Sequence, residues 1–172
     1  FAKSITLTHD IQKMLGTSLE KMTPNELIHC LLKMPVDLFW NGGIGTYVKA
    51  STENHVDVGD PANDSLRVNG CELGAKVVGE GGNLGFSQLG RIEFSRAGGF
   101  INTDAIDNSG GVDSSDHEVN IKILLSQLVD AKHMSLSQRN KLLASMTDEL
   151  GELVIKHNFH QSLVLRISRG QA

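Results

Sequence analysis

The sequence predicts an α/β fold: a partial parallel sheet of about three strands flanked by helices, followed by a helical C-terminal part. Three short, β-prone apolar runs occur at residues 36–40, 76–79 and 100–102, and a polar turn rich in Gly or Asn follows each of them. Helical segments separate the runs, and this order favours right-handed parallel crossovers. The turns would then lie along one edge of the sheet, where ligands of open α/β folds bind. Three strands make only half of a doubly wound sheet.

Two helices are expected before the first strand. Residues 8–16 can form a short one. Thr23, followed by Pro24 and by Glu26 at the third helical position, is a stronger start signal for the second. This helix must end before Pro35, because the residue preceding a proline disfavours the helical conformation.

The segment between the first two strands is expected to be mostly loop. Residues 50–64 are polar and turn-rich, which predicts an exposed excursion before a short helix near residues 62–69. Ser87 predicts the cap of a helix that lies between the second and third strands.

The character of the sequence changes toward the C-terminus. Residues 117–131 predict a long, largely buried helix, and Ser135 or Ser137 predicts the cap of a further helix with one apolar face. We therefore expect residues 1–116 to carry the sheet, and residues 117–172 to form a helical segment packed on it.

Composition and charge argue against several classes of function. The 172 residues carry a formal net charge of −4 with scattered Lys and Arg, so no basic footprint for nucleic acid is visible. No apolar stretch is long enough to span a bilayer, and the N-terminus lacks the pattern of a signal peptide. Cys30 and Cys71 share no metal-ligand spacing, and reduced thiols in a cytoplasmic protein are the simplest interpretation. Because the chain does not begin with Met, we expect a piece of a longer protein.

The turn after the second strand only partly matches a dinucleotide-binding fingerprint. Gly79 and Gly81 match its first two glycines, but Leu84 stands where the third belongs. The better-founded expectation is that Gly81, Gly82 and Asn83 let the backbone approach a flat polar ligand closely.

A second cluster of Asn and Gly begins at Asn108 and precedes the first long C-terminal helix. Peptide N–H groups at the start of that helix can bind a carboxylate or phosphate, and Ser115 can donate one more hydrogen bond. The alternative is that these residues only cap the helix, and residue types alone do not decide between the two.

No metal site is expected from local spacing. His117 and Glu118 begin like the zinc-protease motif HExxH, but Ile121 stands where the second His is required. A group of potential ligands lacks calcium-loop spacing and is expected to be a solvated loop; its members are His55, Asp57, Asp60 and Asp64.

Four long runs resemble the large NAD-specific glutamate dehydrogenases of bacteria, and together they extend from about Met34 through Leu125. They are VDLFWNGGIGTYVKAS, HVDVGDPANDSLRVNG, KVVGEGGNLGFSQLGRIEF and GGFINTDAIDNSGGVDSSDHEVNIKILL. The resemblance implies oxidative deamination of L-glutamate to 2-oxoglutarate and ammonia, with NAD as cofactor and hydride acceptor. It also implies that residues 1–116 are the second half of a Rossmann-like NAD-binding domain.

The resemblance also implies roles for particular residues. Asn83 would lie near the nicotinamide and its ribose, Asn108 would meet the nicotinamide side, and Ser115 would bind the side-chain carboxylate of glutamate. The loop after the first strand would pass the cofactor. The implied cofactor-binding residues are Gly42, Gly43, Gly81, Gly82, Asn83 and Asn108.

The catalytic Lys and Asp of the family, and its phosphate-binding glycine turn, have no counterpart in these residues. We therefore expect no catalytic residue in this chain, no activity from the chain alone, and dependence on the remainder of a parent protein that forms a homo-oligomer. The alternative is a non-catalytic nucleotide-binding or oligomerisation module. The apolar face available for such an interface includes Leu142, Leu143, Met146 and Leu150.

Overall fold

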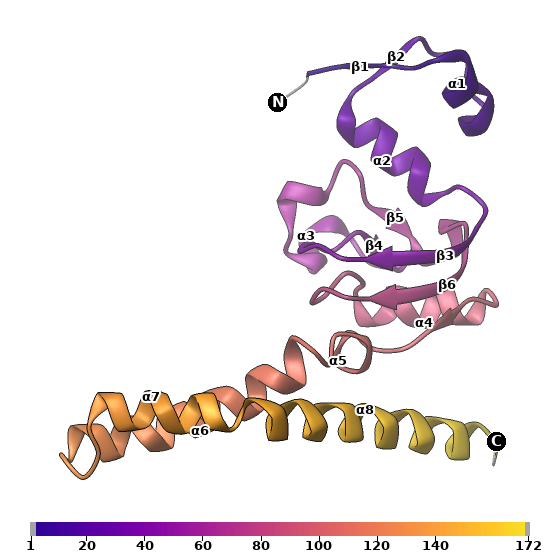
Figure 1. Cartoon of the computed structure of the whole chain (residues 1–172). Helices are drawn as coiled ribbons and strands as arrows, with labels where there is room; N and C mark the ends of the chain where they lie inside the picture. The colour runs from indigo at the N-terminus through magenta and orange to yellow at the C-terminus, as the bar shows by residue number, and fades with distance from the viewer. Residues whose placement is uncertain (1–2, 171–172) are drawn as a thin grey trace. The chain divides into compact units, whose positions relative to one another are not determined.

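The structure is a computed structural model that describes residues 3–170, and it divides the chain into two compact units. The first unit ends at Asp104 and the second begins at Ala105. Each unit is described by itself below (Figure 1). The division expected from the sequence, between residues 116 and 117, concerns function and stays a prediction.

The first unit mixes short helices and strands. Its elements, in chain order, are β1 (Ile5–Thr6), α1 (His9–Leu15), β2 (Lys21–Met22), α2 (Pro24–Leu32), β3 (Val36–Asn41), β4 (Val48–Lys49), α3 (His55–Val58), η1 (Pro61–Asn63), β5 (Val68–Asn69), η2 (Gly70–Glu72), β6 (Ala75–Glu80), α4 (Gln88–Arg96) and β7 (Phe100–Ile101). A short helix, α5 (Asp104–Asp107), follows at the boundary of the two units.

A three-stranded parallel sheet in the order β3-β6-β7 forms the centre of the first unit, which confirms the predicted strands and their direction. Leu38 pairs with Val77, and Val77 with Phe100. The neighbouring β3 and β6 can be followed in Figure 1. Their connection contains the short strands β4 and β5 and several short helical turns, and it is long enough for a parallel crossover.

Helices α2 and α4 begin where the sequence predicted. Thr23 and Glu26 form a reciprocal capping box at the start of α2, with Pro24 at the first helical position. Ser87 caps α4 by accepting a 3.0 Å hydrogen bond from the Gly90 N–H.

Only one face of the sheet is covered by a core. Val78 is buried and belongs to a cluster that includes Val48 and Phe86. Side chains alternate along a strand, so the neighbouring position faces the other way. That position is Val77, which pairs with Leu38 and Phe100. The side chains of Leu38 and Phe100 are 57% and 53% exposed. The opposite face of the sheet is therefore apolar and open.

The predicted helix near residues 62–69 is wrong. The structure has the short 3-10 helix η1, a turn, and then β5, which pairs in parallel with β4. The Asn63 carbonyl accepts the N–H groups of Leu66 and Arg67, which closes a turn instead of propagating a helix. The Asn63 side chain also donates to the Asp60 carboxylate at 2.7 Å, and local hydrogen bonds of Asn and Asp side chains compete with helix formation. The antiparallel pair β1-β2 was also missed.

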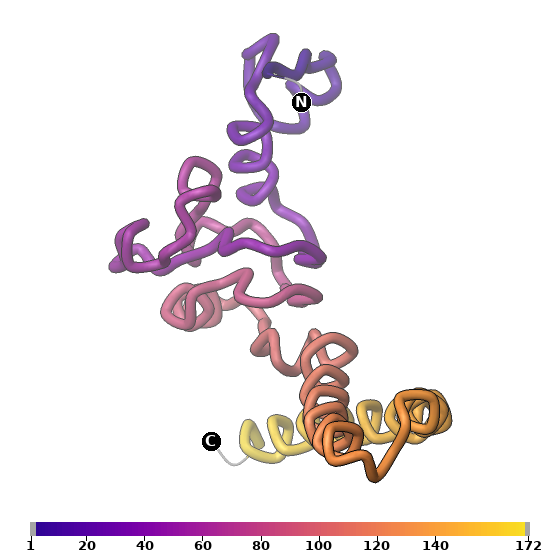
Figure 2. The backbone as a smooth tube through the Cα atoms, turned by 90° about the vertical axis from the view of Figure 1, so that its left-hand side faces the viewer, coloured from indigo at the N-terminus to yellow at the C-terminus, as the bar shows by residue number. Residues whose placement is uncertain are grey.

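The second unit is helical. It contains α6 (Val112–Asp130), α7 (Leu136–Ser145) and α8 (Thr147–Gly170). Ser135 caps α7 in a capping box with Gln138, which decides between the two predicted caps. Figure 2 shows α8, in yellow, crossing α6.

Helix α6 begins earlier than predicted and is less buried. Leu125 is its buried residue, whereas Ile123 and Leu124 are more than half exposed. The expectation of a largely buried helix is wrong because α6 contacts α7 and α8 along a narrow stripe. Within residues 3–170, no helix is long and apolar enough to cross a membrane.

Candidate functional site

Two glycine-containing loops leave the same edge of the sheet. β3 ends at Asn41 and β6 ends at Glu80, and these two residues are paired in the parallel register. The loops that follow carry Gly42 and Gly43 in one case, and Gly81, Gly82 and Asn83 in the other. The carboxyl edge of a parallel sheet is where open α/β folds bind ligands.

Direct contacts hold the two loops together. A Cβ placed on Gly82 would lie 2.2 Å from the Gly43 carbonyl oxygen, so only glycine permits this approach. The Thr46 hydroxyl donates a 2.7 Å hydrogen bond to the Leu84 carbonyl oxygen. The Tyr47 N–H donates to the Gly85 carbonyl at 2.8 Å. The two loops therefore form one rim.

Leu84 adopts a left-handed conformation with φ of 57°, which is unusual for a residue that carries a side chain. The Leu84 N–H donates to the Asp104 carboxylate at 2.9 Å, while its carbonyl accepts from Thr46. This is the position where a dinucleotide fingerprint would have glycine. Hydrogen bonds on both sides of the peptide hold the strained backbone in place.

The Trp40 side chain explains why Gly79, in β6, and Gly81, in the loop after β6, are glycines. Its indole ring lies 2.4 Å from where a Cβ of Gly79 would be, and 2.6 Å from that of Gly81. The ring itself is 58% exposed. The two glycines thus make room for an aromatic side chain of the same rim.

Part of the rim is exposed to solvent. Gly42, Gly43 and Asn83 are exposed, and a Cβ on Gly42 or Gly43 would meet no atom closer than 3.8 Å. Asn41, beside them, is only 4% exposed, and its Nδ2 atom is buried without a hydrogen-bond partner within the described part of the chain. The backbone of Gly42 and Gly43 is therefore open at the same rim as the exposed side chain of Asn83.

A buried ion pair between Glu80 and Arg91 lies next to the rim, since Glu80 is the last residue of β6. Glu80 is fully buried, and Arg91 donates to its Oε2 from Nη2 at 2.6 Å and from Nε at 3.2 Å. The Phe86 N–H donates to the other carboxylate oxygen at 3.0 Å. Burial raises the pKa of Glu80, and the Arg91 guanidinium opposes that rise. Sequence reasoning missed this pair; an acid that ends an apolar strand was the available signal.

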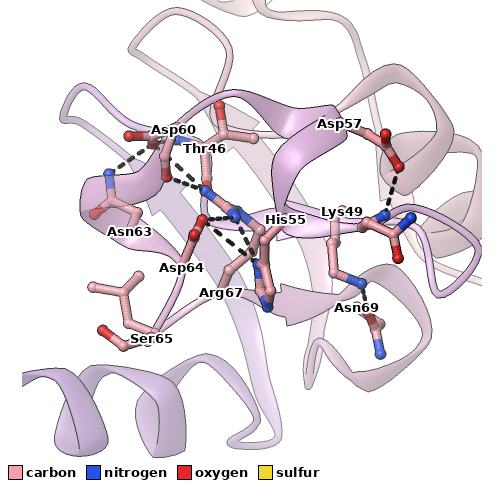
Figure 3. Close-up of polar contacts among 12 residues, drawn as sticks. Thr46, Lys49, His55, Asp57, Asp60, Asn63, Asp64, Ser65, Arg67 and Asn69 are labelled. Atoms are coloured by element: carbon pink, nitrogen blue, oxygen red, sulfur yellow. Dashed lines mark hydrogen bonds and ion pairs between the residues drawn. The ribbon is translucent and has the colours of Figure 1, made fainter.

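Arg67 organises the segment that follows the first loop. Its side chain is fully buried and donates to the Thr46 carbonyl at 2.7 Å, the Asp60 carbonyl at 2.6 Å and the Asp64 carboxylate at 2.6 Å (Figure 3). Its Nη1 also lies 2.8 Å from Nδ1 of His55. His55 and Asp64 remain partly exposed, at 44% and 38%, as the expected solvated loop requires. The prediction missed that they and Asp60 converge on a guanidinium.

The same network fixes Thr46 itself. The Asp60 carboxylate accepts the Thr46 N–H at 2.8 Å and the Asn63 amide at 2.7 Å. These hydrogen bonds lower the pKa of Asp60, and the one from the Thr46 N–H has the largest effect. Arg67 donates to the Thr46 carbonyl, and Asp60 accepts the Thr46 N–H. Both backbone groups of the residue that joins the two loops are therefore hydrogen-bonded.

Asn108 and Ser115 belong to the second unit. The Asn108 carbonyl accepts the N–H groups of Gly111 and Val112, at 2.9 and 2.7 Å, and its side chain lies beside Gly111. The N–H groups of Asp113 and Ser114 both bond the Ser109 carbonyl. The first amides of α6 are thus engaged within the chain, whereas the side chain of Ser115 is exposed on its first turn.

A parallel sheet whose adjacent strands end in joined glycine loops places the first unit in the class of α/β folds that bind ligands at the strand ends. Comparison with known proteins defines the class further. The chain belongs to the family described as bacterial NAD-glutamate dehydrogenase, catalytic domain, whose model matches residues 1–168.

Three curated relatives carry the name NAD-specific glutamate dehydrogenase. The chain is 58% identical to the protein of Pseudomonas aeruginosa over 171 residues, 54% to that of Halomonas elongata over 167, and 51% to that of Mycobacterium tuberculosis over 176. These matches cover 97–99% of this chain but only 10–11% of the relatives. The chain therefore spans about a tenth of the length of the relatives it matches.

Proposed function

We propose that the natural protein carrying this chain is an NAD-dependent glutamate dehydrogenase, which converts L-glutamate to 2-oxoglutarate and ammonia. The observation that carries the proposal is the joined pair of glycine loops at the carboxyl edge of the sheet, in a chain of the bacterial NAD-glutamate dehydrogenase family. Parallel α/β sheets bind nucleotides at this position.

In this proposal the rim contributes the nicotinamide side of the NAD site. Gly42 and Gly43 let the cofactor approach the backbone, and Asn83 offers an exposed amide with both a donor and an acceptor. Gly81 and Gly82 allow the rim to form, because Trp40 and the first loop fill the space beside them. Bound NAD would supply the hydride acceptor of the reaction.

Asn108 and Ser115 complete the proposed assignment. Because the first amides of α6 are engaged, its exposed hydroxyl at Ser115 is the group we assign to the side-chain carboxylate of glutamate. Asn108 is assigned to the nicotinamide. The assignment treats residues 1–116 as the second half of an NAD-binding domain and residues 117–172 as a helical segment, and it gives this chain no catalytic residue.

Kinetics of the natural protein test the substrate assignment. Ser115→Ala should raise the KM for glutamate on the order of tenfold, since it removes one hydrogen bond to a charged group, and leave the KM for NAD nearly unchanged. The matched control is Ser114→Ala, which removes the neighbouring hydroxyl of the same helix. Equal effects of Ser115→Ala on both constants would contradict the assignment.

Asn83→Ala should show the opposite pattern, with the larger increase in the KM for NAD.

The purified 172-residue chain, mixed with glutamate and NAD, should form no NADH, because a general base and the remaining cofactor contacts are needed. NADH formation by this chain alone would overturn that part of the proposal.

A second candidate is an oligomerisation role for the helical unit. It is favoured by apolar side chains at i, i+4 and i+8 on one face of α8 that are open to solvent: Ile155 is 72%, Phe159 64% and Leu163 40% exposed. Such a surface is typical of an interface with another protein. Light scattering of the natural protein with and without Phe159→Ser distinguishes this role, since loss of subunits would follow only if α8 forms the contact.

A further inference from the structure

Two helices of the second unit bring three potential metal ligands together. Asp113 and His117 lie one turn apart on α6, and His157 comes from α8. Their ligand atoms all lie within 4.8 Å of one another. Local sequence spacing predicted no such group, because the second histidine follows the first by 40 positions rather than four.

The distances among the two ring nitrogens and the carboxylate oxygens are close to those among metal ligands. Nε2 of His117 lies 3.3 Å from Nδ1 of His157, which lies 3.2 Å from Oδ2 of Asp113. Nε2 of His117 is 3.6 Å from Oδ1 of the same carboxylate. Ligands at about 2.0–2.1 Å from a tetrahedral zinc ion are separated by about 3.3 Å. The two ring nitrogens and the carboxylate, whose two oxygens each face one of the rings, lie at separations close to this value.

Hydrogen bonding alone does not account well for this arrangement. Nδ1 of a neutral His157 carries at most one hydrogen, yet it faces both the Asp113 carboxylate and Nε2 of His117. If the hydrogen points to the carboxylate, the two ring nitrogens meet without a good bond between them. A cation between the two ring nitrogens and the carboxylate would give each of the three groups a partner; the two imidazole rings are stacked there, with their centroids 5.1 Å apart.

We propose that Asp113, His117 and His157 bind a divalent transition metal ion of the zinc type. Two imidazoles and one carboxylate suit borderline metals, whereas Mg²⁺ and Ca²⁺ prefer sites made only of oxygen ligands. The ligands are partly accessible, with side-chain exposures of 17% for Asp113, 28% for His117 and 39% for His157. Three protein ligands leave the fourth tetrahedral position to water.

The ion would act as a cross-link between α6 and α8. Asp113 lies in the first turn of α6, next to Ser114 and Ser115, and His157 lies within α8. The Asn158 amide, beside His157, already donates to the Ile106 carbonyl at 2.7 Å, so α8 is anchored close to the same point. The metal would therefore fix the position of the start of α6 against α8.

Metal content of the natural protein tests this proposal. The protein is stripped with a chelator, titrated with Zn²⁺ against a chromophoric competitor, and compared with His117→Ala, His157→Ala and Asp113→Asn. Each variant should lose one zinc equivalent, with its affinity at that site lowered on the order of 100-fold or more, since even supporting residues of metal sites account for 10–100-fold. The control is His160→Ala, which removes an exposed histidine of the same helix and should bind zinc as the wild type does.

Two further readouts keep the test independent of variant folding. Co²⁺ added to the stripped wild type should give the intense visible absorption of a tetrahedral site, and Asp113→Asn, which preserves side-chain shape, should abolish it. Zn²⁺ should raise the Tm of the wild type and of His160→Ala but not of Asp113→Asn, whereas Mg²⁺ should leave all three unchanged. The same zinc affinity in the wild type and all three ligand variants would overturn the proposal and leave only a hydrogen-bonded cluster.

Discussion

The hydroxyl of Thr46 donates a 2.7 Å hydrogen bond to the carbonyl oxygen of Leu84, and this bond joins the loops that follow two neighbouring strands. Leu84 needs such support because its backbone is left-handed. Thr46 is nearly buried, and both its N–H and its carbonyl are engaged by the network around Arg67. A polar network about an arginine thus determines the geometry of the rim.

Thr46→Val should loosen the second loop without changing the shape of the side chain. The Leu84 carbonyl would lose its donor, which should lower the free energy of unfolding by about 1–3 kcal/mol. In the natural protein, the KM for NAD should rise more than the KM for glutamate. Urea unfolding and initial-rate kinetics measure the two effects, and Thr46→Ser, which keeps the hydroxyl, should lie close to the wild type in both.

Arg67→Met should be among the most destabilising single changes in the first unit. The guanidinium is fully buried, and its removal leaves two carbonyls and the Asp64 carboxylate without their donor. A buried polar group left without its hydrogen bond costs about 1–3 kcal/mol, whereas the Asp64 carboxylate, 38% exposed, can bind water instead. Arg67→Lys should restore little, since an ammonium group lacks the planar fork. Arg96→Met, at an exposed position of α4, is the control and should change the urea midpoint very little.

Gly79→Ala should be destabilising because of one neighbour. The new methyl group would lie 2.4 Å from two carbon atoms of the Trp40 ring, and overpacking of this kind costs about 1–3 kcal/mol. In a Trp40→Ala background the same change should cost much less. A double-mutant cycle measures the coupling, and additive effects would show that the ring is not the cause. Gly42→Ala meets only ordinary contacts and serves as the control.

Glu93 should make stability depend on acid pH. Burial alone would raise the pKa of Glu93, but hydrogen bonds from the Ser51 hydroxyl and from the N–H groups of Cys71 and Ser51 outweigh it and lower the pKa to about 2. The ordinary value is 4.5. A depressed folded-state pKa stabilises the folded chain above the ordinary value, and this stabilisation is lost as the pH falls from about 4.5 toward 2.

The variant Glu93→Gln measures this contribution. It should lower the free energy of unfolding by about 2 kcal/mol at pH 7, the scale of hydrogen bonds to a charged group. The gap between the variant and the wild type should narrow as the pH falls below 4.5. Glu20→Gln, at an exposed position, is the control and should show no such gap. A gap that stays constant down to pH 2.5 would exclude the carboxylate as its source.

The parts of the fold that the sequence predicted well are those with local signals. The strands β3, β6 and β7 are apolar runs bounded by glycine or asparagine, and the caps at Thr23 and Ser87 satisfy N–H groups within the next turn. The loops after β3 and β6 could be located for the same reason, since each follows a recognisable strand, while their role as a site stays a prediction.

The missed features depend on residues distant in the sequence. Arg67 contacts Thr46 across 21 positions, and Arg91 reaches Glu80 across 11. An isolated arginine or glutamate in a sequence carries no sign of burial, because charged residues are mostly exposed. The short strands β4 and β5 were missed because two residues give no alternation to detect.

Trp40 is the single tryptophan of the 172 residues, and its ring lies against Gly79 and Gly81. The tryptophan fluorescence of this chain therefore comes from the rim. The ring is more than half exposed, so its emission should be sensitive to any molecule that displaces water from this edge of the sheet. The chain therefore contains an intrinsic optical probe at the position where we propose that NAD binds.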